Sequence, residues 1–380
     1  MAELLEVKNL SVSFFTPAGE VQAVRDVSFS LRAGEVLAIV GESGCGKSVL
    51  CKSILHLLPP SARRKSGTIA VNGRDITRLR ERELQKLRGS LFSMVFQDPM
   101  TALNPSMTVG AQLAAAVRVH APRLRGAALE QRVLELMRLV GIDRPEERRG
   151  LYPHHFSGGM RQRVVLAIAL AGDPSILFAD EPTTALDVTI QAQILDLLRE
   201  IQQKLGTATV FVTHDQEEAM SISDMIVVMK FGVVQQIGKP QDVYDNPANL
   251  FVANFLGTPP INIFTGHVKG ERLFIGVDNV MDVPGVKDQD VFVGIRPEGF
   301  ILDMANGTLC CKPQNVEVMG RDVSVVSTHE ASQKPMVRSI IDADNKVDAS
   351  ADVVRYRIKP HKIFLFTRDD EGVRIPFEVK

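Results

Sequence analysis

The sequence contains few cysteines, and none of them stands in a pattern typical of a disulfide or metal site. The four are Cys45, Cys51, Cys310 and Cys311, with no C-x-x-C pair among them. We interpret the adjacent pair at 310 and 311 as two strand residues rather than a disulfide. Chains without disulfides are typical of reducing compartments, so the composition favours a cytoplasmic protein.

Long apolar runs are also missing. The longest, such as VVLAIALA from Val164, fall well short of the roughly 20 residues that a membrane-spanning helix needs. The N-terminal residues MAELLEVKNL lack the basic and apolar regions of a signal peptide. We therefore expect any role at a membrane to come through a partner.

The chain has almost no excess of charge of either sign. Its 44 Lys and Arg residues are balanced by 45 Asp and Glu residues, so we predict no nucleic-acid partner. The short basic run Arg63–Lys65 is interpreted as a solvated loop. With 380 residues, 45% of them hydrophobic, the chain is long enough for two or three globular domains.

Short apolar runs alternate with helical patterns up to about residue 240. The runs are GEVLAIVG, SLFSMVFQ, SILFAD and TATVFVTH, and each stops at a glycine or a polar residue. This alternation predicts an α/β fold, with a mostly parallel sheet covered by helices and ligands bound beyond the carboxyl ends of its strands. Helical spacing dominates from about residue 98 to 157, which predicts an inserted helical subdomain.

The pattern changes beyond residue 240. Residues 241–260 predict a linker helix that ends in glycine and proline. Residues 261–380 contain short strand-like runs separated by turn residues, which predict a smaller all-β domain. We therefore expect a domain at 1–240, a linker helix and a β-rich domain at 261–380.

A phosphate-binding loop is the strongest local motif. The stretch GESGCGKS fits G-x-x-x-x-G-K-[ST] between a predicted strand and a predicted helix. Its glycines let backbone N–H groups face phosphates, and the helix dipole adds positive potential. We expect Lys47 to reach the β- and γ-phosphates and Ser48 to ligate Mg²⁺. The candidate nucleotide-binding residues here are Gly41, Glu42, Ser43, Gly44, Cys45, Gly46, Lys47, Ser48 and Val49.

Polar residues end three other predicted strands. Asp180 is expected to hold Mg²⁺ through water, and Glu181 to orient or deprotonate the attacking water. His214 is either a γ-phosphate sensor or an ordinary turn histidine. Gln97 is either a ligand of Mg²⁺ and of the attacking water or a turn residue. Their order along the chain relative to the phosphate loop favours the catalytic interpretations.

A second helix start suited to an anion lies in the stretch HFSGGMRQR. Together with the motifs above, it resembles the ATP-binding cassette, the ATPase subunit of ABC transporters. The signature of that family is Leu-Ser-Gly-Gly-Gln, and Phe156 and Met160 replace its Leu and Gln here. The resemblance implies a head-to-tail dimer in which each signature closes over ATP held by the other subunit. The residues that would do so are Ser157, Gly158 and Gly159.

The same resemblance implies two further nucleotide contacts. Asp187, in TALD, matches the loop that links the two sites across the dimer. Phe14 falls where the family has an aromatic residue that stacks on adenine. Phe15 is a competing choice for this contact, and the alternative interpretation of Phe14 is a core residue of the first strand.

The two parts of the chain resemble different branches of importer ATPases. Residues 4–212, with QDPMTALNPSMTVG and DEPTTALDVTIQAQIL, are similar to dipeptide and oligopeptide importer ATPases, although His155 stands where that group often has Glu. Residues 213–380, with VGIRPE, resemble maltose, glycerol-phosphate and polyamine importer ATPases that carry a TOBE-type β-domain. The implied role is ATP-driven uptake through permease subunits at the cytoplasmic face of the membrane, with a substrate-binding protein acting indirectly.

Several alternatives stay open at this level. The imported solute is a peptide in the favoured interpretation and a sugar, glycerol phosphate or polyamine in the alternative. A regulatory or soluble ABC ATPase and an exporter are rival functions. The second cassette is either another copy of this chain or a paralogue, and the nucleotide is either ATP alone or GTP as well.

Overall fold

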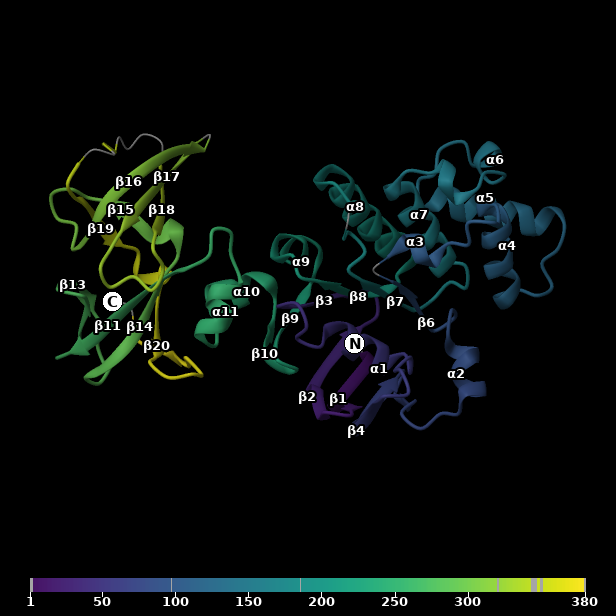
Figure 1. Cartoon of the computed structure of the whole chain (residues 1–380), viewed down its shortest axis with the longest axis horizontal. Helices are drawn as coiled ribbons and strands as arrows, with labels where there is room; N and C mark the ends of the chain where they lie inside the picture. Colours follow the sequence, from purple (N-terminus) through teal and green to yellow (C-terminus); the bar gives the residue numbers. More distant parts are fainter. Residues whose placement is uncertain are drawn as a thin grey trace. The chain divides into compact units, whose positions relative to one another are not determined.

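The computed structural model describes residues 3–96, 98–184, 186–319, 321–342, 347–348 and 351–378. The chain forms two compact units that divide after Pro240. Figure 1 shows the elements of both.

A mostly parallel sheet forms the centre of the first unit. Its strand order is β10-β9-β3-β8-β7-β6, and only β10 runs antiparallel to its neighbour. Strands β3, β7 and β8 are buried along their whole length, as expected for strands covered on both faces. The bounds are β3 (Val36–Gly41), β6 (Phe92–Val95), β7 (Ile176–Asp180), β8 (Ala208–Thr213), β9 (Met225–Lys230) and β10 (Val233–Gly238).

A second, antiparallel sheet of order β2-β1-β4-β5 belongs to the same unit. Leu5 and Val27 of this sheet share one core with Ile39 of the parallel sheet and Leu50 of helix α1 (Lys47–Ile54). The packing of the long strands therefore fixes the position of the loop that precedes α1. The bounds are β1 (Glu3–Thr16), β2 (Gly19–Arg32), β4 (Ala62–Val71) and β5 (Arg74–Asp75).

Between residues 98 and 157, all regular elements that the structure describes are helical. Buried Leu113 and Val117 of α4 and Val133 and Leu136 of α5 form the apolar faces of this segment. In the parts of the chain described above, no helix combines the length and apolar character that crossing a membrane requires. The α-helices that follow α1 in the first unit are α2 (Glu81–Leu87), α3 (Pro99–Ala102), α4 (Val109–His120), α5 (Ala127–Leu139), α6 (Pro145–Arg148), α7 (Gly158–Ala169), α8 (Val188–Leu205) and α9 (Gln216–Ile222).

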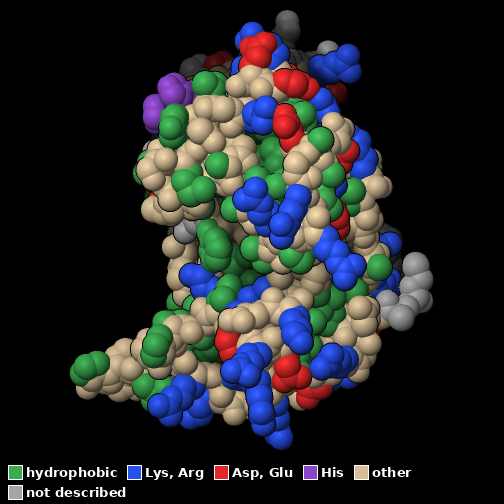
Figure 2. Space-filling model, turned by 90° about the vertical axis from the view of Figure 1, so that its right-hand side faces the viewer, with side chains coloured by type: hydrophobic (Ala, Val, Ile, Leu, Met, Phe, Trp, Pro, Cys, Tyr) green, Lys and Arg blue, Asp and Glu red, His purple; other side chains and the backbone are tan. Residues whose placement is uncertain are grey.

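The charge of the first unit is unevenly distributed. Residues 52–163 contain 20 Lys and Arg against nine Asp and Glu, so the balanced total hides a basic segment. Figure 2 shows many Lys and Arg side chains on the side that carries α4 and α5.

The second unit is built almost entirely from antiparallel strands. One sheet has the order β13-β12-β11-β14-β20-β21 and the other β15-β19-β16-β17-β18. A single core lies between them, with Phe264, Val293, Val325 and Tyr356 among its buried members. The bounds are β11 (Asn262–Lys269), β12 (Arg272–Ile275), β13 (Asp278–Asp282), β14 (Gln289–Ile295), β15 (Phe300–Leu302), β16 (Leu309–Met319), β17 (Asp322–Thr328), β18 (Val337–Asp342), β19 (Val354–Ile358), β20 (Ile363–Thr367) and β21 (Arg374–Ile375).

Residues 241–260, where we expected one linker helix, contain two short helices, α10 (Pro240–Asp245) and α11 (Leu250–Phe255). A fully buried arginine, Arg296, joins them to the sheets. Its guanidinium donates to the carbonyl of Ala253 at 2.9 Å and to that of Tyr244 at 2.8 Å. The segment is therefore part of the packed second unit.

Candidate nucleotide site

The start of α1 is prepared for an anion. The helix begins at Lys47 directly after the glycine-rich loop, and its N-cap, Gly46, has φ of 104° and no side-chain cap. The first turn also contains no acidic residue. A helix start without a side-chain cap leaves backbone N–H groups and the positive end of the dipole available to a ligand.

Glycine is required at two positions of this loop. A Cβ on Gly46 would lie 2.3 Å from the carbonyl oxygen of Ala23, and one on Gly41 would lie 2.2 Å from that of Met229. Both glycines also have positive φ, which larger residues adopt at a cost. The loop is thus packed tightly against β2 and β9.

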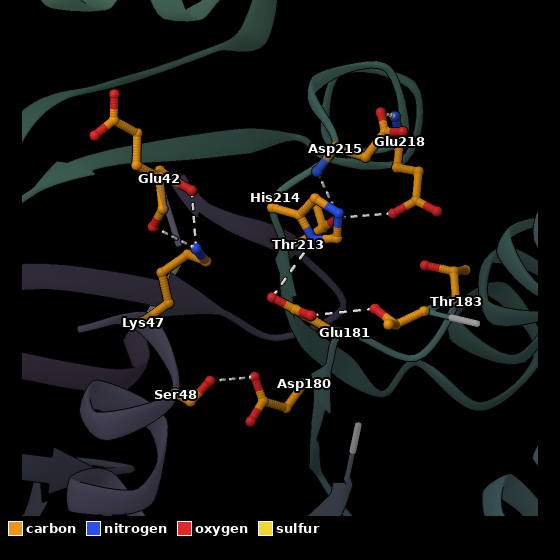
Figure 3. A network of polar contacts seen from close by, with 12 residues as sticks. Glu42, Lys47, Ser48, Asp180, Glu181, Thr183, Thr213, His214, Asp215 and Glu218 are labelled. Atoms are coloured by element: carbon orange, nitrogen blue, oxygen red, sulfur yellow. Dashed lines mark hydrogen bonds and ion pairs between the residues drawn. The ribbon is translucent and has the colours of Figure 1, made fainter. Parts of the chain in front are cut away.

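Lys47 supplies a buried positive charge to the loop. Its side chain is only 5% exposed, and Nζ donates to the carbonyl oxygens of Gly41 at 2.8 Å and Glu42 at 3.1 Å. Figure 3 shows Lys47 and its contact with Glu42. Among the described residues, no carboxylate lies within ion-pair distance of Nζ. Because a buried cation without an anionic partner is unfavourable, this charge suits a phosphate group.

Two oxygen ligands lie beside the loop. The Ser48 hydroxyl donates to Oδ1 of Asp180 at 2.8 Å (Figure 3), and Asp180 is 4% exposed. Burial raises the pKa of Asp180, and the Ser48 hydrogen bond opposes that rise. A hydroxyl and a carboxylate are the hard oxygen donors that Mg²⁺ takes next to nucleotide phosphates, so the residues fit this metal. Over the residues that the structure describes, no group of three or more His, Cys, Asp or Glu side chains is placed so that it could hold a metal ion.

Glu181 and His214 meet at the ends of neighbouring strands. Nδ1 of His214 lies 3.5 Å from Oε1 of Glu181 (Figure 3), and Oε2 of Glu181 accepts a hydrogen bond from Thr184 at 3.1 Å. The backbone of Glu181 has φ of 47°, which is uncommon for a residue other than glycine. The His214 side chain is 59% exposed against 17% for Glu181, so the histidine faces outward and the carboxylate is held by its neighbours.

One cavity of about 760 Å³ brings many of these side chains together. Of the predicted site residues, it is lined by Phe14, Ser43, Gly44, Gly46, Lys47, Ser48, Val49, Glu181 and His214. Asp180 does not line the cavity itself, but it accepts a hydrogen bond from Ser48, which does. Cys45 is buried, and burial raises its thiol pKa. Gln97 lies outside the described residues.

The signature residues Ser157–Gly159 and Asp187 of TALD lie at the starts of two helices, α7 and α8, away from the lining of this cavity. Ser157 and Gly158 are exposed at the start of α7, where the Ser157 hydroxyl accepts from the backbone N–H of Met160 at 3.4 Å. Asp187 caps α8 through Ile190, and a Cβ on Gly159 would lie 2.5 Å from Ile190. The two helix starts therefore pack together, and neither lines the cavity at the phosphate loop.

Part of the cavity wall was not predicted from the sequence. Val21, Gln22, Ala23 and Arg25 come from β2, Thr184 from the segment after β7, and Phe231 and Gly232 from the turn between β9 and β10. Thr184 is the first residue of TALD, and the other six residues belong to no nucleotide-binding motif. Their one local signal is an aromatic residue directly before a turn glycine, in MKFGV.

Comparisons with known proteins identify the family to which the chain belongs. Residues 24–184 match the family model described as ABC transporter. The dipeptide transport ATP-binding protein DppD of Bacillus subtilis is 51% identical over 261 residues, which cover 68% of this chain and 78% of that protein. The oligopeptide transport ATP-binding protein OppD of Escherichia coli is 46% identical over 257 residues, which cover 68% and 76%.

A solved structure is also similar. The ATP-binding cassette MJ0796, in a dimeric post-hydrolysis state bound to ADP and Pi, has a TM-score of 0.54 and 29% sequence identity. The match covers 62% of this chain and 98% of that one. The chain therefore belongs to the ATP-binding proteins of ABC transporters. The predicted fold class, ATP binding and transport-coupled ATPase activity are confirmed.

Proposed function

We propose that this chain is the ATP-hydrolysing subunit of a peptide importer and acts at the cytoplasmic face of the membrane through permease subunits. The similarity to dipeptide and oligopeptide transport ATP-binding proteins supports the peptide class. Their identity of 48–51% over about two thirds of the chain favours this class over the sugar, glycerol-phosphate and polyamine alternatives. The β-rich second unit would be a TOBE-type regulatory module.

The observation that carries the ATPase assignment is the convergence of Lys47, Ser48 and Glu181 on one cavity. Lys47 would bind the β- and γ-phosphates, and Ser48 with Asp180 would hold Mg²⁺. The metal would neutralise phosphate charge during transfer. Glu181, steadied by Thr184, would accept the proton of the attacking water, and His214 would contact the γ-phosphate.

Hydrolysis would require two cassettes. The exposed signature start does not line the cavity of its own chain, and the similar cassette MJ0796 is dimeric. We infer that Ser157, Gly158 and Gly159 complete the site of a second subunit, either an identical copy or a paralogue. Asp187 would join the two sites. Closure on ATP would then move the permease subunits, because ATP contacts both subunits only in the closed state.

Replacement of the proposed base tests the chemistry. Glu181→Gln should lower the hydrolysis rate about 10²–10⁴-fold, the usual contribution of a positioned base, while ATP binding is retained. The variant should accumulate as an ATP-bound dimer in size-exclusion chromatography. Glu217→Gln, on the exposed side of α9, is the matched control. Near-normal hydrolysis by Glu181→Gln would remove this residue from the role.

An uptake assay tests the substrate class. Cells that lack this chain should lose uptake of labelled di- and oligopeptides and keep uptake of maltose and spermidine. The wild-type gene, but not the Glu181→Gln gene, should restore peptide uptake. Loss of sugar or polyamine uptake instead would assign the chain to the alternative importers, and loss of neither would favour a regulatory or soluble ATPase.

A further inference from the structure

An aromatic side chain is exposed at the rim of the nucleotide cavity. Phe231, in the turn between β9 and β10, is 65% exposed and lines the same cavity as Phe14 and Lys47. Its backbone has φ of 47°, a conformation that is a strained exception for a bulky residue. Neither local backbone preference nor burial of apolar surface explains phenylalanine at this position.

The turn is attached directly to the phosphate loop. The N–H of Gly232 donates to the carbonyl of Cys45 at 2.9 Å, and the carbonyl of Gly232 accepts from Arg25 at 2.8 Å. A Cβ on Gly232 would lie 2.7 Å from the carbonyl oxygen of Ala23, so the turn is in close contact with β2. Phe231 is therefore held in a defined position relative to the loop.

The cavity has both polar and apolar lining. Lys47, Ser48, Glu181 and His214 suit the phosphates, whereas Phe14, Val21 and Phe231 provide apolar surface. Val21 is 56% exposed, and Nζ of Lys230 lies 6.0 Å from the ring centroid of Phe231. Exposed apolar side chains around one cavity mark a ligand surface, and aromatic rings stack on bases of any identity.

We propose that Phe231 is a second aromatic contact for the nucleotide base, in addition to Phe14. The proposal rests on the proposed ATPase function and extends it to a base-binding residue outside the sequence motifs. Because stacking does not read hydrogen-bonding groups, the contact should strengthen ATP and GTP binding to similar extents. It should contribute nothing to a ligand that has phosphates and no base.

The experiment compares ATP with inorganic tripolyphosphate, which lacks the base and the ribose. Dissociation constants of both are measured by calorimetry on the full chain with Mg²⁺. Phe231→Ala should weaken ATP binding roughly five- to 150-fold, the range found for base stacking, and leave tripolyphosphate binding unchanged. Phe231→Tyr should restore ATP affinity because it retains the ring.

Phe15→Ala is the matched control. Phe15 is also exposed, but its ring lies near Arg63 and Lys65, and it does not line the cavity. This variant should bind both ligands like the wild type. Phe14→Ala should behave like Phe231→Ala if both rings contact the base.

Three outcomes would overturn the proposal. Equal weakening of ATP and tripolyphosphate by Phe231→Ala would show that the ring only supports the phosphate loop. Unchanged affinity for both ligands would assign the ring to another contact, such as a protein partner. Full ATP affinity in Phe231→Ala with none in Phe231→Tyr would also contradict stacking. Failure of the proposed ATPase function is distinct, because the wild type would then bind ATP without hydrolysing it.

Discussion

The starts of α1 and α7 are both rich in glycine and serine, yet they differ in capping and charge. Helix α1 has a glycine N-cap, no side-chain cap and a buried lysine at its first residue. Helix α7 is capped by Ser157, although at a long 3.4 Å, and its first residues are glycines without charge. One start lies in a cavity, and the other is exposed.

This difference bears on the two helix starts that we propose to bind phosphate, α1 and α7. Charge, free N–H groups and a cavity wall allow α1 to hold a nucleotide within one chain. The start of α7 offers neutral donors and already satisfies one N–H with its own serine. These properties are consistent with the supporting contact to a second chain's ATP that we propose for it.

The largest expected effect comes from removing the charge at α1. Lys47→Ala should weaken ATP binding at least about a hundredfold, because charge-assisted hydrogen bonds contribute about 1.5–3 kcal/mol each. ATP at a fixed concentration should then raise the unfolding temperature much less than in the wild type, which differential scanning fluorimetry measures. Lys204→Ala, on the exposed end of α8, is the control. If Lys47→Ala binds ATP with wild-type affinity, nucleotide binding at the start of α1 does not depend on the charge of Lys47.

A charge placed at α7 should separate binding from hydrolysis. Ser157→Arg introduces a bulky cation where the other subunit's phosphates would dock, so we expect steady-state ATPase activity to fall about a hundredfold. ATP affinity of the isolated chain should change less than twofold, as measured by calorimetry. Gln203→Arg adds the same charge on the exposed surface of α8. Full activity in Ser157→Arg would mean that each chain hydrolyses ATP by itself.

The smallest effect concerns the cap of α7. Ser157→Ala should lower stability by about 0.5–1 kcal/mol, the lower part of the range for N-caps, because the hydrogen bond is long. Asp187→Ala should cost more, since Asp187 caps α8 at 3.0 Å. Chemical denaturation of both variants without nucleotide measures the difference. Equal losses would show that the two caps are equally strong.

Motifs that are continuous in sequence were predictable. The phosphate loop connects β3 to α1 without interruption, so its glycines, Lys47 and Ser48 define a local geometry. Asp180 and Glu181 end a buried strand, and parallel strands bring their carboxyl ends to one edge of the sheet. Side-by-side strands β7 and β8 thus account for the contact between Glu181 and His214.

Contacts between distant segments were not predictable. In the antiparallel sheet of the first unit, β1 pairs with β4, which lies more than 40 residues away in the sequence. Nothing in the sequence of a long strand indicates which other strand it will pair with. The placement of Phe231 depends on Gly232 meeting Cys45, almost 190 residues away. The buried Arg296 likewise donates to carbonyl groups of α10 and α11, which lie about 40 to 50 residues before it in the sequence.

By itself, the amino-acid sequence determined the alternation of elements, the phosphate loop, the acidic strand end and the signature, because each depends on neighbouring residues. The tertiary structure alone decided which walls complete the nucleotide cavity and that the signature residues are not part of its lining. Those properties come from packing between segments far apart in the chain, where hydrogen bonds and close backbone contacts select one arrangement.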